Sequence, residues 1–426
     1  MSEVDVIDSP KGILVVGGGI SGITVAVEAA EVGYDTFLIE KEAYLGGRVV
    51  RANEYFPKLC SPNCGLEINF RRIKTNPKVS CFTLAEVEAI SGKEGAYEVD
   101  VRLAPRMVND NCTSCGKCVE VCPVERANDF NYGMDGTKAV YLPHPMAFPM
   151  QYVIDPHVCK GADCAKCVDA CQYGAIELGM SEKKLKLKVG SVVVATGWKP
   201  YDAAKLDNLG FGACANVITN VMMERLASPD GPTKGKIVRP SDGKEVNSVA
   251  FVQCAGSRDE NHLPYCSGVC CLGSLKQSTY VKEQNAEAKV SIFYIDVRAM
   301  GILEDFYQRV QKYDGLSLVK GKVAKITEDP STKDLTVEAE DIASGTKVKE
   351  NVEMVVLATG MVPSTVEGKM PVDITYDNYG FVAEERAGVY AAGCARRPTD
   401  VSSSVQDATR AALKAIQSVA RGGANG

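Results

Sequence analysis

The stretch Ile13-Leu-Val-Val-Gly-Gly-Gly-Ile-Ser-Gly22, followed by a helical run and then Asp35-Thr-Phe-Leu-Ile-Glu40, decides the fold. An apolar run that enters a glycine-rich turn and continues into an amphipathic helix predicts a strand–turn–helix–strand unit. Gly17, Gly19 and Gly22 fit the Gly-x-Gly-x-x-Gly spacing, which permits a tight turn, close approach of a pyrophosphate and close helix–strand packing. The segment therefore predicts a dinucleotide site; the alternative is a tight turn in an α/β fold that binds no ligand.

The residues that flank this turn extend the predicted site. The first helical amides, at Ile20 and Ser21, are expected to point at the diphosphate. Glu40 lies at the end of the second strand, eighteen residues after Gly22, and suits a ribose diol. Lys41 follows it directly and is included in the predicted site.

Length and charge limit the possible classes of protein. With 426 residues the chain is long enough for two or three domains. A net charge of −6 gives no basic face for nucleic acid and no polybasic membrane anchor. The apolar runs fall short of the roughly 18 residues that a spanning helix needs. The acidic N-terminus argues against a signal peptide, so a cytoplasmic location is predicted.

The seventeen cysteines are clustered rather than spread evenly. Eight lie between residues 112 and 171, and four more lie between 254 and 271. In a reducing compartment such clustering indicates metal, with iron–sulfur and zinc as the candidates. Only three histidines are present, which leaves little for histidine-based catalysis or metal binding.

Two cysteine runs lie in a segment, residues 105–180, where hydrophobic periodicity disappears. The first is Cys112-x2-Cys115-x2-Cys118-x3-Cys122-Pro, and the second is Cys159-x4-Cys164-x2-Cys167-x3-Cys171. The first run matches the bacterial ferredoxin pattern, in which the fourth cysteine binds the cluster of the other run. Zinc sites usually pair two Cys-x2-Cys knuckles instead. The segment predicts two [4Fe–4S] clusters, one held by Cys112, Cys115, Cys118 and Cys171 and the other by Cys159, Cys164, Cys167 and Cys122.

A second nucleotide-binding-like region is expected after residue 245, but its phosphate loop is missing. The buried strand at 249–253 leads into Cys254-Ala-Gly-Ser-Arg instead of glycines, and Cys266, Cys270 and Cys271 follow. A helix is expected at about 272–284 and a strand at 290–296. The four cysteines predict a third iron–sulfur cluster, although adjacent cysteines are unusual ligands. The alternative is a cysteine-rich loop with a buried or redox-active pair.

The remaining motifs complete the predicted division of the chain. Val-Val-Val-Ala195-Thr196-Gly197 and Val-Val-Leu-Ala-Thr-Gly360 read as the strands that end each nucleotide domain. A strand at 389–393 and a helix at about 402–419 return to the first domain. The predicted ranges are a first dinucleotide-binding part at 1–104, the ferredoxin-like insert at 105–180, a return to the core at 181–245, a degenerate nucleotide domain at 246–360 and a last part of the dinucleotide-binding domain at 361–426.

The acid followed by Gly46-Gly47-Arg48 resembles the FAD-binding unit of two-dinucleotide-domain flavoproteins of the thioredoxin and glutathione reductase type. That resemblance implies FAD, with Gly47 and Arg48 at the diphosphate, the Val87 backbone near the adenine, and the Ala195–Gly197 turn nearby. It also implies a contact from the strand that ends at Gly393. Relatives carry aspartate after that glycine, whereas this chain has Cys394, which leaves the side-chain contact open.

Over nearly the whole chain the motifs resemble the A subunit of heterodisulfide reductase. The shared segments are the FAD fingerprint, the ferredoxin insert, Gln253-Cys-Ala-Gly-Ser-Arg, Tyr265-Cys-Ser-Gly-Val-Cys-Cys, Ile295-Asp-Val-Arg and Ala392-Gly-Cys-Ala. We expect the chain to lack that family's long N-terminal extension and its C-terminal ferredoxin domain. On that expectation, its length and domain content resemble a compact branch, the A subunits of quinone-interacting membrane-bound oxidoreductase complexes of sulfate-reducing organisms.

This resemblance implies an electron-transfer subunit peripheral to the inner membrane. Its partners would be adenylylsulfate reductase, a membrane haem subunit and a second flavin and iron–sulfur subunit, with electrons supplied by menaquinol. Two alternatives stay open: electron bifurcation as in heterodisulfide reductase, and a self-contained NAD(P)H-dependent oxidoreductase. No acid–base constellation emerges, so no catalytic residue is assigned. The Cys60/Cys64 pair is open to three interpretations: a redox pair, a partial metal site or small core residues.

Overall fold

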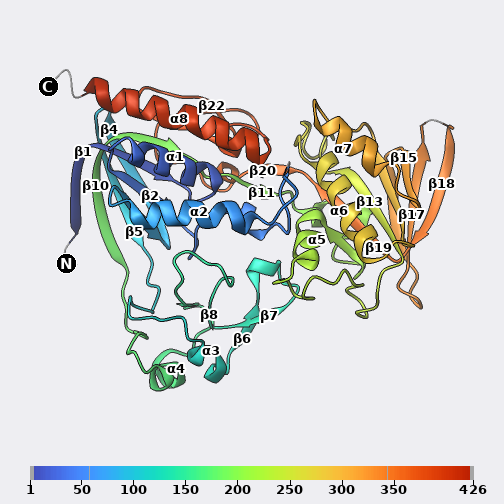
Figure 1. The fold of residues 1–426 in the computed structure, drawn as a ribbon, viewed down its shortest axis with the longest axis horizontal. Coiled ribbons are helices and arrows are strands. Elements are labelled where there is room, and N and C mark those ends of the chain that lie inside the picture. The colour runs from blue at the N-terminus through green and yellow to red at the C-terminus, as the bar shows by residue number, and fades with distance from the viewer. Residues whose placement is uncertain (1–3, 57, 343, 423–426) are drawn as a thin grey trace.

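The structure is a computed structural model that describes residues 4–56, 58–342 and 344–422. The outer ends of the first and last predicted ranges, 1–3 and 423–426, lie outside the described residues. Figure 1 shows three regions: a sheet with helices at the left, a small loop-rich unit below it, and a second α/β region at the right. Within the described ranges, no helix is long and apolar enough to cross a bilayer.

The first sheet has the strand order β3–β2–β1–β10–β5–β4, and β23 pairs with β10. Its parallel strands are β1 (Asp5–Val16), β2 (Thr36–Glu40), β3 (Val79–Thr83), β10 (Lys183–Val194) and β23 (Val389–Ala391), and its antiparallel edge is β4 (Ala85–Lys93) and β5 (Ala96–Leu103). Helices α1 (Ile20–Glu31), α2 (Pro62–Thr75) and α8 (Val401–Gly422) cover one face (Figure 1). Ile13 to Val15 are fully buried, as expected for a parallel strand covered on both faces.

Strand β1 begins at Asp5, eight residues before the apolar run. Its outer half pairs with Leu185–Val189 of β10, and the register shifts between Ser9 and Ile13. This outer half is largely exposed and therefore lacks the continuous apolar run by which a buried strand is recognised.

The insert forms the loop-rich unit at the bottom of Figure 1. Its regular elements are short: α3 (Lys117–Val121), α4 (Lys166–Ala170), β6 (Glu125–Ala127), β7 (Gly136–Lys138), β8 (Val140–Tyr141) and β9 (Val153–Ile154). Its small core contains Val108, Cys118, Val140, Ile154 and Ile176. Five more of the eight cysteines in the two runs pack against this core. Such a small apolar core is typical of domains stabilised by a metal group.

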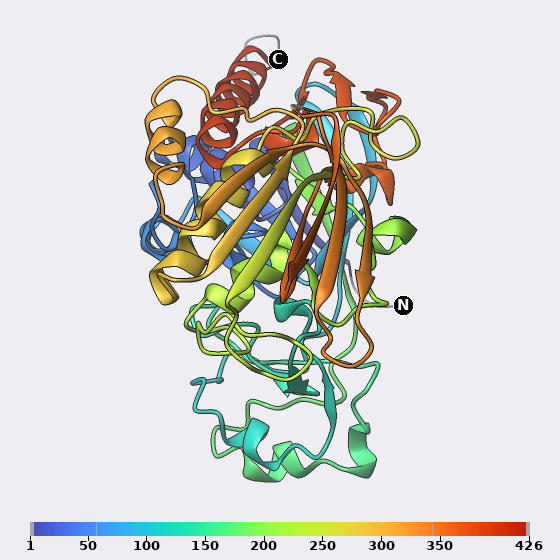
Figure 2. The same ribbon diagram turned by 90° about the vertical axis from the view of Figure 1, so that its right-hand side faces the viewer.

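The second sheet is parallel, with the order β12–β19–β13–β14–β15. It consists of β12 (Val217–Thr219), β19 (Met354–Thr359), β13 (Ser248–Ala255), β14 (Lys289–Tyr294) and β15 (Leu316–Lys320). Helices α5 (Asn220–Ala227), α6 (Cys270–Gln284) and α7 (Leu303–Val310) pack on one face. The antiparallel sheet β16 (Val323–Glu328), β17 (Leu335–Asp341) and β18 (Thr346–Val352) packs on the other (Figure 2).

Two antiparallel strands connect the two α/β regions, β11 (Trp198–Pro200) and β20 (Met361–Pro363). An ion pair between Lys199 and Glu367 lies beside them. Strands β21 (Thr375–Tyr376) and β22 (Val382–Glu384) form a small hairpin before the chain re-enters the first sheet at β23. The second α/β region is thus inserted into the first.

Candidate functional site

The glycine turn between β1 and α1 is shaped by backbone contacts that exclude side chains. A Cβ on Gly17, whose φ is +109°, would lie 2.3 Å from the Ala195 carbonyl oxygen. A Cβ on Gly22 would lie 1.8 Å from the Gly17 carbonyl oxygen, so α1 begins almost in contact with the turn. At Gly19 the nearest heavy atom would be 3.9 Å away, which leaves open space at the start of the helix. Gly17, Gly19 and Gly22 together form a backbone surface without side chains, here called the glycine cradle. This surface fits a diphosphate at the first amides of α1.

Glu40 lies at the end of β2, directly beside the glycine turn. Its carboxylate accepts hydrogen bonds from the Gly18 amide at 2.6 Å and from the Glu42 amide at 2.8 Å. Burial raises the pKa of Glu40 to about 7, against the opposing effect of these two bonds. Lys41, its neighbour, is exposed. A buried acid held in this position fits a ribose hydroxyl pair, the role expected from the sequence.

The Gly46-Gly47 turn folds back over the glycine cradle. Gly46 donates a backbone hydrogen bond to the Gly18 carbonyl at 2.8 Å, and a Cβ on Gly47 would lie 2.9 Å from the Gly19 Cα. Arg48 turns toward the insert and the connecting strand, where it donates to the Trp198 carbonyl at 3.2 Å and the Tyr132 hydroxyl at 3.3 Å. The arginine thus lies where the FAD-binding region, the insert and β11 meet.

The other predicted FAD residues lie at the same edge of the sheet or beside it. Ala195 donates a backbone hydrogen bond to Val16 at 2.8 Å, and the buried Thr196 hydroxyl has no partner within the described residues. An unpaired buried hydroxyl beside the glycine cradle fits a polar ligand there. Gly393 follows β23, its amide donates to the Asp407 carboxylate at 2.8 Å, and a Cβ there would lie 2.2 Å from the Ser21 Oγ.

Two further predicted positions differ in their surroundings. Cys394 is buried, and its thiol lies 3.4 Å from the Thr399 carbonyl oxygen. Val87 lies on β4, where the register against β5 is irregular. The structure therefore brings the glycine turn, Glu40, Thr196 and Gly393 together at one sheet edge, whereas Val87 lies on the adjoining antiparallel strand.

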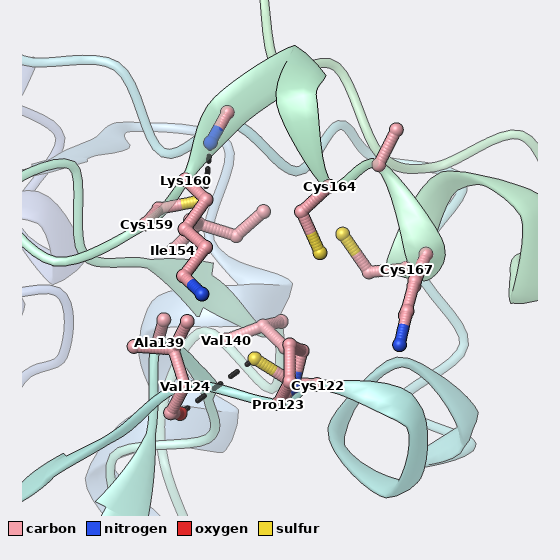
Figure 3. Close-up of a pocket in the computed structure, with 13 residues that line it drawn as sticks. Cys122, Pro123, Val124, Ala139, Val140, Ile154, Cys159, Lys160, Cys164 and Cys167 are labelled. Carbon is pink, nitrogen blue, oxygen red and sulfur yellow. Dashed lines mark hydrogen bonds between the residues drawn. The ribbon is translucent and has the colours of Figure 1, made fainter.

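Cysteines of both runs surround a cavity in the insert. The cavity occupies about 340 Å³ including its open mouth, and Cys122, Cys159, Cys164 and Cys167 all line it (Figure 3). Figure 3 shows Cys122 and Cys159 entering from different segments, with Cys164 and Cys167 completing the ring. The Gly161 amide donates to the Cys159 sulfur at 3.4 Å. Four thiols around one cavity fit the ligand exchange between runs that is characteristic of two-cluster ferredoxins.

The first cysteine run is gathered around α3. Burial and the neighbouring Cys112 raise the pKa of the Cys118 thiol to about 11. The pKa of Tyr152 is raised by burial and by the thiols of Cys118, Cys112 and Cys115. Tyr152 and Cys112 pack against the small core that contains Cys118. The Cys171 sulfur accepts a hydrogen bond from the Ala175 amide at 3.3 Å. A cluster binds its cysteines as thiolates, so its binding would displace the proton that burial favours on Cys118.

The four cysteines of the second α/β region also converge. Cys254 leaves β13 with a positive φ of +56°, and Cys270 and Cys271 form the first turn of α6. Burial and then Cys271 raise the pKa of the Cys254 thiol to about 11. Burial together with Cys254, Cys271 and Cys266 raises the pKa of Cys270 still further. These thiols lie at the positive end of the α6 dipole, which favours an anionic group.

Among the described residues, no set of three or more His, Cys, Asp or Glu side chains lies in a geometry that could hold a single metal ion. The support for a cluster in the insert is instead the cavity that Cys122, Cys159, Cys164 and Cys167 share. The Cys60/Cys64 pair lies at the start of α2, and the Tyr55 hydroxyl is its neighbour. From the sequence, Gln253 is recognised only as part of a shared segment, and its side chain is assigned no role. Sequence reasoning missed the ion pair between Glu224 and Lys276, which belong to no quoted motif and are brought together by the fold.

Comparison with known proteins agrees with this site. Residues 12–58 match the FAD dependent oxidoreductase family, and residues 105–125 match the 4Fe-4S binding domain family. The chain is 36% identical to the A subunit of the H(2):CoB-CoM heterodisulfide,ferredoxin reductase of Methanothermobacter thermautotrophicus, over 96% of this chain and 64% of that protein. It is 37% identical to an iron-sulfur A subunit of the CoB--CoM heterodisulfide reductase of Methanopyrus kandleri, over 99% and 66%.

The chain is a homologue of the heterodisulfide reductase A subunits. This A-subunit homologue carries an FAD-dependent oxidoreductase domain and a 4Fe–4S domain, as predicted. It spans less than two thirds of the length of the relatives named above.

Solved structures give the fold of the A-subunit homologue. Thioredoxin reductase from T. acidophilum matches with a TM-score of 0.53 at 16% identity, over 96% of this chain and 98% of that one. Thioredoxin reductase from Lactococcus lactis matches with a TM-score of 0.52 at 14% identity, over 96% and 99%. The predicted fold class, a two-dinucleotide-domain flavoprotein with a ferredoxin-like insert, is confirmed.

Proposed function

We propose that this chain is an electron-transfer subunit that holds FAD and three iron–sulfur clusters and relays electrons between redox partners. One observation carries the proposal. A nicotinamide domain would place its glycine phosphate loop where β13 meets the next helix, whereas this chain has Cys254 at the end of β13 and begins α6 with Cys270 and Cys271. FAD exchanges electrons singly or in pairs, and iron–sulfur clusters exchange them singly.

The chain's own residues hold these groups. Gly17, Gly19 and Gly22 admit the FAD diphosphate, and Glu40 binds a ribose. Within the insert, Cys122 joins Cys159, Cys164 and Cys167 around one cluster, a set supported by their shared cavity. The other two clusters are held by Cys112, Cys115, Cys118 and Cys171, and by Cys254, Cys266, Cys270 and Cys271.

The proposed physiological role is electron transfer between menaquinol and adenylylsulfate reductase in sulfate reduction. The support is the resemblance to the compact branch of A subunits from quinone-interacting complexes. The chain would dock to a membrane haem subunit through or beside a second flavin and iron–sulfur subunit, which would keep it at the cytoplasmic side of the inner membrane. Reconstitution with those subunits tests this role: a menaquinol analogue should then reduce the FAD, and adenylylsulfate reductase should reoxidise it.

A second candidate is a component of a heterodisulfide reductase-type complex in which one flavin divides an electron pair between unequal acceptors. The identity of 36% over 96% of the chain favours it. In that case, with the other subunits of such a complex present, CoB–CoM heterodisulfide and not adenylylsulfate reductase would reoxidise the FAD.

The relay function itself is tested with the purified protein under anaerobic conditions. We expect NADH and NADPH to leave the flavin absorbance band unchanged, while dithionite bleaches it. Rapid bleaching by either nicotinamide would contradict the relay and favour an NAD(P)H-dependent oxidoreductase. Iron and acid-labile sulfide analysis should give about twelve irons per FAD, four for each cluster. A count of about eight irons per FAD would contradict the third cluster.

A further inference from the structure

Near the end of strand β13 lies a buried glutamine whose side-chain amide is unpaired. Gln253 is 5% exposed, and neither its Nε2 nor its Oε1 has a hydrogen-bond partner within the described residues. It directly precedes Cys254, at the point where the register between β13 and β19 shifts. A buried amide in this state is uncommon, since roughly 90% or more of buried polar groups are paired.

The orientation of Gln253 follows from the alternation of side chains along β13. Val249 and Phe251 belong to the apolar cluster that includes Leu275 of α6. Because successive strand residues point to opposite faces, Gln253 lies on the same face as Val249 and Phe251. That face is the one covered by α6, the helix that begins with Cys270 and Cys271.

A second unpaired polar group lies on α6 itself. Ser274 is 1% exposed and its Oγ has no partner within the described residues. It follows Cys270 by four residues, so the two side chains lie one above the other on the same helix face. Farther along α6 the pattern changes: the Ser278 and Thr279 hydroxyls bond the carbonyls of Leu275 and Lys276, both at 2.7 Å.

Gln253 and Ser274 are therefore two buried side chains beside the cysteines whose donor groups are unpaired. Farther along α6, the unpaired atom of buried Gln277 is an acceptor, its Oε1, while its Nε2 donates to Glu224 at 2.6 Å. A buried donor that stayed unpaired would destabilise the folded protein. We propose that the Gln253 amide and the Ser274 hydroxyl donate hydrogen bonds to the sulfur atoms of the iron–sulfur cluster held by Cys254, Cys266, Cys270 and Cys271, and so set its reduction potential. The inference rests on the proposed third cluster and assigns these two residues a tuning role.

The direction of the effect follows from charge. Reduction adds an electron to the cluster, and a hydrogen bond to its sulfur is stronger in the more negative state. Donors therefore stabilise the reduced form and raise the potential, one of the recognised ways in which a protein tunes such clusters. Both side chains are positioning and tuning residues, since neither is a ligand.

The test is an EPR-monitored redox titration of the intact protein. The third cluster is identified as the signal that Cys266→Ser removes. Gln253→Leu keeps the side-chain size but removes the donor, and Ser274→Ala removes a single hydroxyl. We expect both variants to keep about twelve irons per FAD and to lower the midpoint potential of this signal alone. Ser278→Ala is the matched control, with the same substitution on the same buried helix, and should leave the potential unchanged.

An unchanged potential in Gln253→Leu and Ser274→Ala protein that retains the cluster would overturn the tuning role. If Gln253→Leu loses iron, Ser274→Ala decides the question by itself. A wild-type protein with about eight irons per FAD would overturn the third cluster, and with it the tuning role, whereas the flavin and ferredoxin assignments would stand. The two failures are therefore distinguishable.

Discussion

Lys276 of α6 and Glu224 of α5 form a buried ion pair, with 2.9 Å between Nζ and Oε1. Glu224 also accepts hydrogen bonds from Gln277 at 2.6 Å and from the backbone amide of Asn53 at 3.0 Å. Lys276 donates to the Glu54 carbonyl oxygen. Since residues 53 and 54 follow the Gly46-Gly47 turn, this pair holds the second α/β region against the FAD-binding region.

Removing the lysine alone should be strongly destabilising. Lys276→Met leaves the Glu224 carboxylate buried without its cation, and we expect a loss of about 3–5 kcal/mol in the free energy of unfolding. The double variant Glu224→Gln with Lys276→Met removes both charges and should recover most of that loss. Chemical denaturation measures both. Lys349→Met, which breaks the exposed pair with Glu338, is the control and should cost about 0–1 kcal/mol. Equal losses in the single and double variants would contradict this account.

Substitutions at two glycines of the glycine cradle should affect cofactor binding and folding separately. Gly19→Ala places its Cβ in open space, so the flavin-free protein should keep its melting temperature while FAD affinity falls, because the methyl group occupies the diphosphate position. Gly22→Ala meets the Gly17 carbonyl oxygen at 1.8 Å and should destabilise the fold itself. Thermal unfolding and flavin-fluorescence titration measure the two effects. Gly179→Ala, with no neighbour within 4 Å, should change neither. Full FAD affinity in Gly19→Ala would place the diphosphate elsewhere.

Cys122 should behave as a ligand of the second cysteine run. It shares a cavity with Cys164, so Cys122→Ser is expected to alter the same cluster signal that Cys164→Ser alters. Cys115→Ser reports the other cluster of the insert. EPR spectra of the dithionite-reduced variants distinguish the two patterns. Cys214→Ser, outside every run, serves as the control. A Cys122→Ser spectrum that matches Cys115→Ser would reverse the assignment.

Acid should weaken the attachment of α8. Burial tends to raise the pKa of Glu385, but hydrogen bonds from Arg410 and Lys414 hold that pKa at about 2, below its usual 4.5. A depressed pKa means that this stabilisation is fully present above pH 4.5 and is lost as the pH falls toward 2. Glu385→Gln should therefore lower stability at pH 7 and reduce its dependence on pH below 4.5. Urea unfolding at several pH values measures this, and an unchanged pH dependence would contradict it.

Local patterns allowed the sequence to predict much of the site. The glycine turn, the strand before it and the acid after it lie within 28 residues, and cysteine spacing is itself the geometry of a cluster loop. The sequence predicts helix α6 from about Leu272, but the helix begins at Cys270, so the two adjacent thiols lie in a helical turn and not in an extended segment.

Contacts between distant residues could not be predicted. The Asn53 amide and Glu224 are separated by 171 positions, and no periodic pattern marks either of them. The unpaired state of Gln253 depends on which neighbours surround it, which is a property of the folded core. The sequence predicts Arg48 at the diphosphate. Its contacts with Trp198 of β11 and Tyr132 of the insert depend on how these distant segments pack around it.

The position of β23 beside β10 determines when the first sheet is complete during synthesis. Val389 of β23 pairs with Val192 of β10, and Val194 of β10 pairs with Val16 of β1. The sheet therefore joins residues near position 16 to residues near position 389. The ribosome must therefore release both intervening regions before this sheet closes. The insert and the second α/β region consist of contiguous segments and can fold earlier, as domains generally do on the ribosome. Loading of the cysteine sites can thus precede completion of the flavin pocket, and the half-made sheet would expose the edge of β10 until then.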